Sequence, residues 1–177
     1  VKIGNSMPRY HYGISANASW NGIDFSVFFQ GIGRQHIYPH QNNFAFWGPF
    51  SRVFSSFIPS DLPSKLWSES NPNAYFPRPV AGIARDGMVL TKVNDRYLQN
   101  LAYCRLKNLT VGYTLPASLT QKAKISAVRI YFSGENLFTI SKLDSKYLDP
   151  EQIAGKGASG NVYPYSKTFA FGLDITF

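Results

Sequence analysis

The sequence predicts an all-β fold, an antiparallel transmembrane β-barrel segment of about five strands with long extracellular loops. Apolar and polar residues alternate with a period of two along several segments, as they do in strands with one apolar face. Short and long connections separate these segments in turn, a rhythm typical of outer-membrane barrels. The sequence is rich in aromatic residues, which make up 16% of the 177 residues, while charged residues make up only 16%, against roughly 25% in globular proteins. The many rings must therefore be covered by a core, an interface or lipid.

The first two predicted strands form a hairpin. They span about 9–20 and 23–31, and Asn21-Gly22 between them is a strong hairpin signal because both residues tolerate positive φ. The apolar row of the first strand is Tyr12, Ile14, Ala16, Ala18 and Trp20. The apolar row of the second is Ile23, Phe25, Val27 and Phe29. This pattern predicts a tight hairpin with faces of opposite polarity.

Two more strands are predicted at about 103–114 and 126–137. The apolar row of the later strand is Val128, Ile130 and Phe132. The matching row of the earlier strand is Leu109, Val111 and Tyr113, but Arg105 and Lys107 fall in the same row. A cation facing the middle of a bilayer costs about 2–4 kcal/mol. Either both cations lie at headgroup level or a β-bulge near Asn108 shifts the phase, and the sequence leaves both interpretations open.

The last predicted strand spans about 167–177 and alternates most regularly. Its apolar row is Phe169, Phe171, Leu173, Ile175 and Phe177. A terminal Phe resembles the signal that the barrel-assembly machinery reads, so Phe177 is a candidate assembly signal. Because the smallest membrane barrels have about eight strands, five strands predict one part of a larger barrel.

The two long connections, about 32–97 and 138–165, are the predicted external loops. The first is rich in aromatic rings, which either form a core of the loop's own or contact a partner or a sugar. The candidates for substrate or partner contact are Tyr38, Phe46, Trp47, Trp67 and Tyr75. A core is the simpler interpretation, because a loop this long must bury side chains of its own to stay ordered.

If the apolar rows face lipid, the polar rows border a water-filled lumen. The candidate lumen-facing residues are Asn17, Asp24, Arg129, Tyr131, Glu135 and Asp174. Most of them are expected to satisfy the barrel interior rather than to recognise cargo.

The sequence predicts no enzyme, cofactor or metal site. Its three His allow no catalytic triad to be located, and the single Cys104 excludes an internal disulfide. His36 and His40 are four residues apart, but Pro39 argues against the helix that would align them. Residues 155–160 match G-x-G-x-x-G without the strand and helix that a dinucleotide site needs. The net charge of +8 comes from scattered cations, so no nucleic-acid partner is expected.

Several longer segments carry a family likeness. Residues 103–116 read YCRLKNLTVGYTLP, residues 130–139 read IYFSGENLFT, and residues 168–177 read TFAFGLDITF. Upstream, residues 3–10 read IGNSMPRY. Together and in this order, the segments resemble the SusC/RagA family of TonB-dependent outer-membrane transporters, with Glu135 where that family usually has Gln.

This resemblance implies the last five strands of a barrel of about 22 strands in the outer membrane of a Gram-negative bacterium. It also implies a plug domain and a TonB-contacting segment N-terminal to residue 1. The implied partners are a SusD-like lipoprotein, the TonB complex acting through the plug, the barrel-assembly machinery, the lipid bilayer, and a cargo of oligosaccharides or peptides. The alternative is a soluble all-β carbohydrate-binding module whose aromatic loop stacks on glycans.

Overall fold

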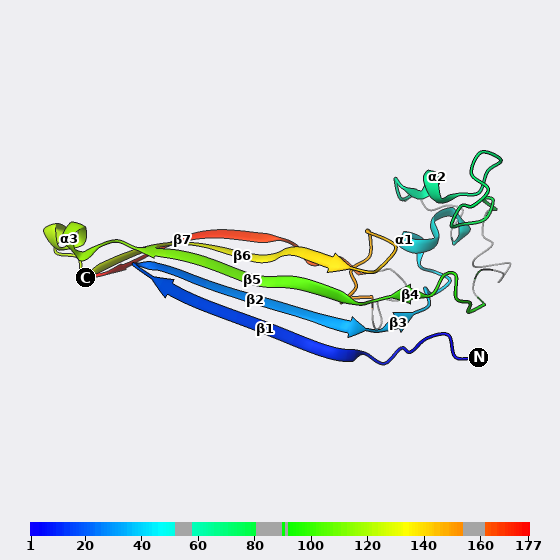
Figure 1. Ribbon diagram of the computed structural model, residues 1–177. Coiled ribbons are helices and arrows are strands. Elements are labelled where there is room, and N and C mark those ends of the chain that lie inside the picture. The colour runs from blue at the N-terminus through cyan, green and yellow to red at the C-terminus, as the bar shows by residue number, and fades with distance from the viewer. Residues whose placement is uncertain (52–57, 81–89, 91, 154–161) are drawn as a thin grey trace. The chain divides into compact units, whose positions relative to one another are not determined.

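The computed structural model describes residues 1–51, 58–80, 90, 92–153 and 162–177. The G-x-G-x-x-G stretch at 155–160 therefore lies outside the described residues. The chain divides into two units (Figure 1). The sheet unit comprises Tyr10–Gly33, Tyr103–Ser141 and Tyr165–Phe177, and the loop unit comprises Val1–Arg9, Arg34–Ala102 and Lys142–Pro164.

A five-stranded open sheet forms the sheet unit, with the strand order β1-β2-β5-β6-β7. Its strands are β1 (Arg9–Trp20), β2 (Ile23–Arg34), β5 (Tyr103–Thr114), β6 (Ala127–Ser141) and β7 (Thr168–Thr176). Neighbouring strands from β2 to β7 pair antiparallel. Two strands run beyond their expected ends, β2 to Arg34 and β6 to Ser141.

Short turns lie at one end of the sheet, where Figure 1 also shows the C-terminus. Asn21 and Gly22 join β1 to β2 with φ of 48° and 84°, the positive values that a type I′ turn requires. Between β5 and β6 the chain forms α3 (Ala117–Thr120) and η2 (Gln121–Ala123). Lys124 then takes the left-handed conformation that ends the turn, with φ of 58°.

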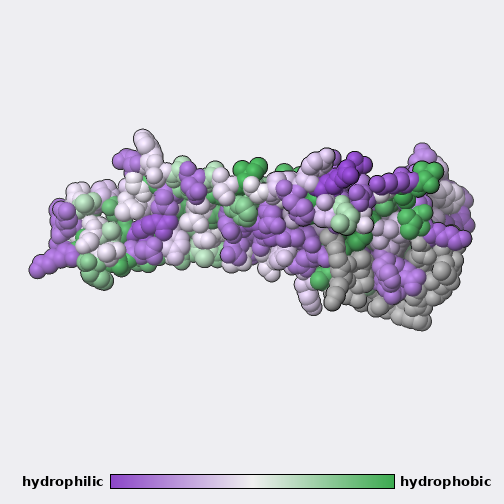
Figure 2. Space-filling view, turned by 90° about the horizontal axis from the view of Figure 1, so that it is seen from below, coloured by the Kyte–Doolittle hydropathy of each residue, from purple (hydrophilic) through white to green (hydrophobic). Residues whose placement is uncertain are grey.

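One face of the sheet is a continuous apolar surface. The pairing aligns Phe25, Val111, Phe132 and Phe171 across four neighbouring strands. On β7 the exposed fractions are 61% for Phe169, 83% for Phe171 and 58% for Leu173. Figure 2 shows hydrophobic side chains reaching the surface along the strand region, interspersed with polar ones. None of the described residues covers this row, whereas a soluble carbohydrate-binding module would pack protein against it.

A β-bulge in β5 decides between the two interpretations of Arg105 and Lys107. Phe28 lies opposite Asn108 and Phe29 opposite Leu106, so Lys107 is an extra residue without a partner on β2. The phase therefore changes at Lys107, and Leu106 joins the apolar row between Phe29 and Phe138. Arg105 consequently moves to the polar face.

The loop unit contains short elements around an aromatic core, rather than one structureless connection. The elements are β3 (His36–Ile37), α1 (Phe44–Trp47), η1 (Gly48–Phe50), α2 (Leu62–Lys65) and β4 (Gln99–Asn100). β3 and β4 pair antiparallel, and the Asn43 side chain caps α1 by accepting a hydrogen bond from the Phe46 amide at 3.0 Å. The core consists of Phe46, Trp47, Phe50, Leu62, Phe76, Leu90 and Tyr97.

No helix among the described residues is both long enough and apolar enough to cross a membrane.

Candidate functional site

Five of the six candidate lumen-facing residues share one face of the sheet, and four of them lie close together on it. Across the strands, Asp24 aligns with Gly112, Gly112 with Tyr131, and Tyr131 with Gly172. Arg129 lies opposite Asp174 and two residues from Tyr131, so both also belong to this face. The polar row therefore crosses four strands, on the opposite side from the apolar row.

Arg129 connects the acidic residues of this row. Its Nε and Nη2 donate hydrogen bonds to Oδ1 and Oδ2 of Asp24, at 2.8 and 2.6 Å. Its Nη1 donates to Oδ2 of Asp174 at 3.1 Å, and its guanidinium carbon lies 4.7 Å from the centre of the Tyr131 ring. One guanidinium thus joins β2, β6 and β7 through a fork geometry that Lys cannot reproduce.

Two glycines make this arrangement possible, and the sequence interpretation missed both. A Cβ on Gly112 would lie 2.6 Å from Nη2 and 2.7 Å from Nε of Arg129, and it would also contact Asp24. A Cβ on Gly172 would collide with the Tyr131 ring. The sequence signal that could have identified them is a Gly among the polar residues of a strand, because such a Gly leaves room for a long side chain from the neighbouring strand.

The remaining two lumen candidates lie outside this network of described residues. Glu135 shares the polar face and lies opposite Asn108 and Thr168. Asn17 is an exposed residue of β1.

Arg105 organises the other end of the same strands. It is only 2% exposed, and its Nε donates to Oγ1 of Thr139 at 2.8 Å. Its guanidinium carbon lies 5.0 Å from the Tyr165 ring centre, and Nζ of Lys107 lies 4.5 Å from the same centre. Two cations therefore hold Tyr165 next to β5, at the point where the chain approaches β7.

Two of the five aromatic contact candidates are core residues, which corrects their assignment as contacts. Phe46 is 3% exposed and Trp47 is 0% exposed. Their rings meet edge to face with centres 4.7 Å apart, and Nε1 of Trp47 donates to the His40 carbonyl at 3.1 Å. Because they have almost no free surface, their role in this fold is to pack the loop unit.

The other three candidates are partly buried and have structural partners. The Tyr38 hydroxyl donates to the Leu90 carbonyl at 2.5 Å, and burial raises the pKa of Tyr38 to about 12. The Tyr75 hydroxyl accepts from Nε2 of Gln99 at 3.1 Å, and burial raises the pKa of Tyr75 above its ordinary value. The guanidinium carbon of Arg78 lies 4.9 Å from the centre of the Trp67 ring.

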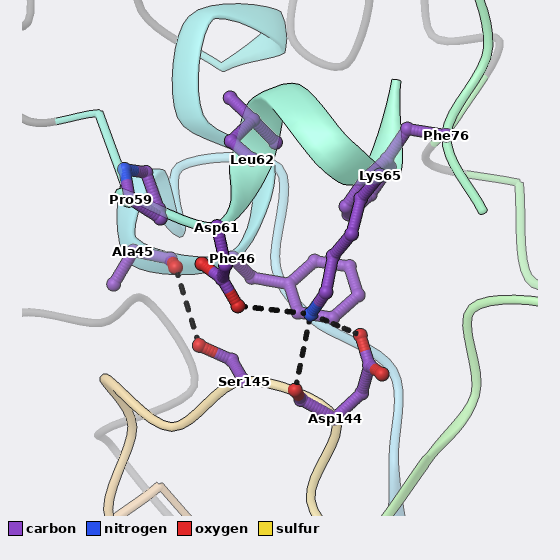
Figure 3. A pocket seen from close by; sticks show the side chains of 9 residues that line it. All are labelled: Ala45, Phe46, Pro59, Asp61, Leu62, Lys65, Phe76, Asp144 and Ser145. Atoms are coloured by element: carbon purple, nitrogen blue, oxygen red, sulfur yellow. Dashed lines mark hydrogen bonds and ion pairs between the residues drawn. The ribbon is translucent and has the colours of Figure 1, made fainter. Parts of the chain in front are cut away.

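Charged residues join two of the three sequence segments of the loop unit, Arg34–Ala102 and Lys142–Pro164 (Figure 3). Nζ of Lys65 lies 3.3 Å from Oδ2 of Asp61 and 3.3 Å from Oδ2 of Asp144. Beside them Oγ of Ser145 donates to the Ala45 carbonyl at 3.5 Å. The cavity between these residues measures about 10 Å³, which is room for one water molecule rather than for a ligand.

The histidines and the assembly-signal candidate have simpler surroundings. Nδ1 of His36 accepts from the Asn5 amide at 3.4 Å, and Nδ1 of His40 accepts from the Asn42 amide at 3.2 Å. Within the described ranges, no three His, Cys, Asp or Glu side chains gather as metal ligands would. Phe177 is 87% exposed.

Comparison with known proteins places this geometry in context. No family model matches the chain. Two curated relatives come from Formosa agariphila: TonB-dependent receptor P26 is 27% identical over 100% of the chain, and TonB-dependent receptor P3 is 30% identical over 99%. The chain spans only 18% and 17% of their lengths.

Solved structures of a peptide importer, RagAB, show a similar fold. The closed-closed state matches with a TM-score of 0.65 and 25% identity, covering 97% of this chain and 18% of that one. The open-open state matches with a TM-score of 0.60 and 24% identity, covering 97% and 17%. The open sheet, its two contrasting faces and these likenesses lead to one conclusion: the chain is a β-barrel segment of the SusC/RagA family of TonB-dependent receptors.

Proposed function

We propose that this segment forms part of the outer-membrane wall of a TonB-dependent importer for bulky nutrients, either oligosaccharides or peptides. In this proposal the importer works with a SusD-like surface lipoprotein and draws energy from the TonB complex through a plug domain. The support comes from relatives named TonB-dependent receptors and from the fold shared with RagAB, a peptide importer.

The observation that carries the proposal is the contrast between the two faces of the sheet. The row through Phe25, Phe132 and Phe171 is open to its surroundings, while the opposite row carries Asp24 and Arg129. Fully burying a large apolar side chain contributes about 1.5–3 kcal/mol, so hydrocarbon stabilises the first row. The charged row needs water, which a lumen provides.

Within the proposal, the polar residues maintain a hydrated wall along which cargo passes. Asp24, Arg129 and Asp174 neutralise one another in part, so the wall presents a fixed, partly balanced charge rather than an open acidic patch. Tyr131 adds a ring whose face is already occupied by Arg129. Asn17 and Glu135 complete the proposed lumen surface.

The loop unit and Phe177 have further proposed roles. Trp67 and Tyr75 keep part of their surface and are the aromatic candidates for contact with the lipoprotein or with cargo, together with Tyr38. Phe177 is proposed as the signal for the barrel-assembly machinery.

Spin labels on adjacent residues test which face meets lipid. In the full-length protein with Cys104 replaced by Ser, one nitroxide label is placed at Phe132→Cys and another at Tyr131→Cys, and both proteins are reconstituted in vesicles. The Phe132 label should respond more to dissolved oxygen, and the Tyr131 label more to a water-soluble nickel complex. Labels at Phe171→Cys and Ser133→Cys repeat the comparison. If all four labels are equally accessible to the nickel complex, the proposal that one face of the sheet contacts lipid is wrong.

Transport itself is tested in cells that lack the gene. Complementation with the full-length protein should restore growth on either an oligosaccharide mixture or a peptide mixture, and only while TonB is active. Purification from those cells should recover a lipid-anchored surface protein. Growth that is restored equally without TonB would contradict energy-coupled import.

A further inference from the structure

A basic hollow lies in the loop unit where the N-terminal segment, the first residue of β1 and the last residue of β2 meet. Its volume is about 180 Å³. It is lined by Lys2, Ile3, Gly4, Asn5, Arg9 and Arg34. Three of these six residues are cations and none is acidic.

Hydrogen bonds join the wall of this hollow to Gln35 and to His36, the first residue of β3. The His36 amide donates to the Asn5 carbonyl at 2.8 Å, and Nε2 of Gln35 donates to the Ser6 carbonyl at 2.9 Å. A Cβ on Gly4 would lie 2.8 Å from Cδ2 of Leu98, so glycine allows the N-terminal segment to pack this closely. These contacts therefore hold the backbone that lines the hollow.

The three cations lack acidic partners inside the part of the chain that the structure describes. Two other cations of these ranges are neutralised: Lys65 by Asp61 and Asp144, and Arg129 by Asp24 and Asp174. Lys2, Arg9 and Arg34 are exposed and have no carboxylate within ion-pair distance there. Like charges around one hollow repel each other, and a bound anion relieves that repulsion.

The alternation of β2 gives the parity of Arg34, the last residue of that strand. β2 pairs regularly with β5 from Phe29 to Ile32, because the extra residue at the bulge belongs to β5. Arg34 therefore has the same parity as Asp24 and Gln30, which lie in the polar row.

We propose that this hollow binds an oxyanion group, a carboxylate or a sulfate, carried by the imported nutrient. The proposal rests on the proposed importer function and adds the chemical class of its cargo. Guanidinium groups bind planar and tetrahedral oxyanions through paired hydrogen bonds, and Arg9 and Arg34 provide two of them. The volume accommodates one such group with a few water molecules.

Anion binding is measured first, on the full-length protein purified in detergent. Fluorine NMR follows trifluoroacetate as the carboxylate probe, and inorganic sulfate serves as the competitor. The variant Lys2→Gln/Arg9→Gln/Arg34→Gln should weaken binding about tenfold or more. The control Lys122→Gln/Lys124→Gln/Lys142→Gln, which removes three other cations, should change it less than about twofold. Equal loss in both triple variants, or no sulfate competition in the wild type, overturns the site.

Uptake then separates this site from the proposed function. In complemented cells the triple variant should import an acidic oligosaccharide or peptide several-fold more slowly, and a neutral one at the normal rate. If the wild type imports neither, the importer proposal fails while the anion measurement stands. A different result is that the triple variant co-purifies with less phosphate-bearing lipid but imports the acidic nutrient normally. In that case the hollow binds a lipid headgroup, and the proposal that it binds cargo is wrong. Arg34→Gln, compared with Arg34→Lys, repeats the test with a single change.

Discussion

Arg129 on β6 and Asp24 on β2 are joined by two hydrogen bonds, at 2.8 and 2.6 Å, although β5 lies between their strands. The guanidinium reaches Asp24 by passing over Gly112, the residue of β5 that aligns with Asp24. On its other side it also donates to Asp174 of β7. A single side chain therefore connects three strands of the polar face.

Removing either acidic partner should lower the thermal stability of the full-length barrel, by unequal amounts. Asp24 accepts two short hydrogen bonds from Arg129 and Asp174 accepts one longer bond, so Asp24→Asn should cost more than Asp174→Asn. We expect a fall of a few degrees for the first. The measurement is the temperature at which the folded band disappears on cold SDS gels. Lys122→Gln, in the turn between β5 and β6, is the control, and equal effects of both Asp variants would contradict the bidentate pairing.

Gly112→Ala should destabilise the barrel much more when Arg129 is present than when it is absent. The added Cβ would lie 2.6 Å from Nη2 of Arg129, so the guanidinium would have to leave Asp24. Once Arg129→Ala has removed the guanidinium, the Asp24 carboxylate is no longer held beside Gly112 and can turn away from the same Cβ. The two changes should therefore be strongly non-additive. The same gel assay on both single variants and the double variant measures this coupling. Additive effects would show that Gly112 matters for another reason.

Deleting Lys107 should prevent normal folding, whereas Lys107→Ala should be tolerated. Without the extra residue, Arg105 would rotate into the apolar row and Leu106 into the polar row. A cation facing the middle of a bilayer costs about 2–4 kcal/mol, and Arg105 would also lose its bond to Thr139. The yield of folded, membrane-inserted protein measures the effect. A normal yield from the deletion would mean that the bulge can move along β5.

The strands and their two faces could be predicted because alternation is a local property of the sequence. Phe169, Phe171 and Leu173 predict an apolar row regardless of which strand lies beside them. Asn21-Gly22 likewise predicts its turn without reference to any other segment. The bulge could be suspected from Arg105 and Lys107, but its position depends on the pairing of β5 with β2. The register between two segments about 80 residues apart cannot be predicted from the sequence of either segment alone.

The parts of the site that could not be predicted depend on contacts between distant elements. Arg129, Asp24 and Asp174 were each assigned to the polar face, but their shared network requires the register of four strands. Phe46 and Trp47 were candidates for contact because a Trp in a loop looks the same whether it is buried or exposed. Only the packing of the loop unit shows that both are core residues.

Trp47→Ala should disorganise the loop unit while the barrel remains folded. Trp47 is fully buried, and its ring meets Phe46, Phe76 and Tyr97 with centres 4.7 to 6.2 Å apart. Replacing a buried Trp by Ala lowers the free energy of unfolding by about 3–5 kcal/mol. Trp67→Ala should lower it less, because Trp67 is partly exposed. Limited proteolysis of the full-length protein, read together with the folded band on cold gels, separates the two units. Similar protease resistance in both Trp variants would contradict the core assignment.

The loop unit should lose stability as the pH rises from about 10 to about 12. Burial raises the pKa of Tyr38 from 10.0 to about 12, and burial also raises the pKa of Tyr75 and Tyr97. In this window the unfolded loop has already released the Tyr38 proton while the folded loop still holds it, so rising pH favours unfolding. Below about pH 10 both states keep the proton, and the contribution of Tyr38 does not change with pH.

Tyr38→Phe tests the assignment of this pH dependence. Phe cannot ionise, so the variant should show a weaker loss of near-ultraviolet circular dichroism between about pH 10 and about pH 12. It should also lack one tyrosinate absorbance step near pH 12, because the missing group is the one whose pKa is raised to about 12. Tyr163→Phe is the matched control, since Tyr163 is 93% exposed. An unchanged circular dichroism profile in Tyr38→Phe would assign the pH dependence to the other buried tyrosines.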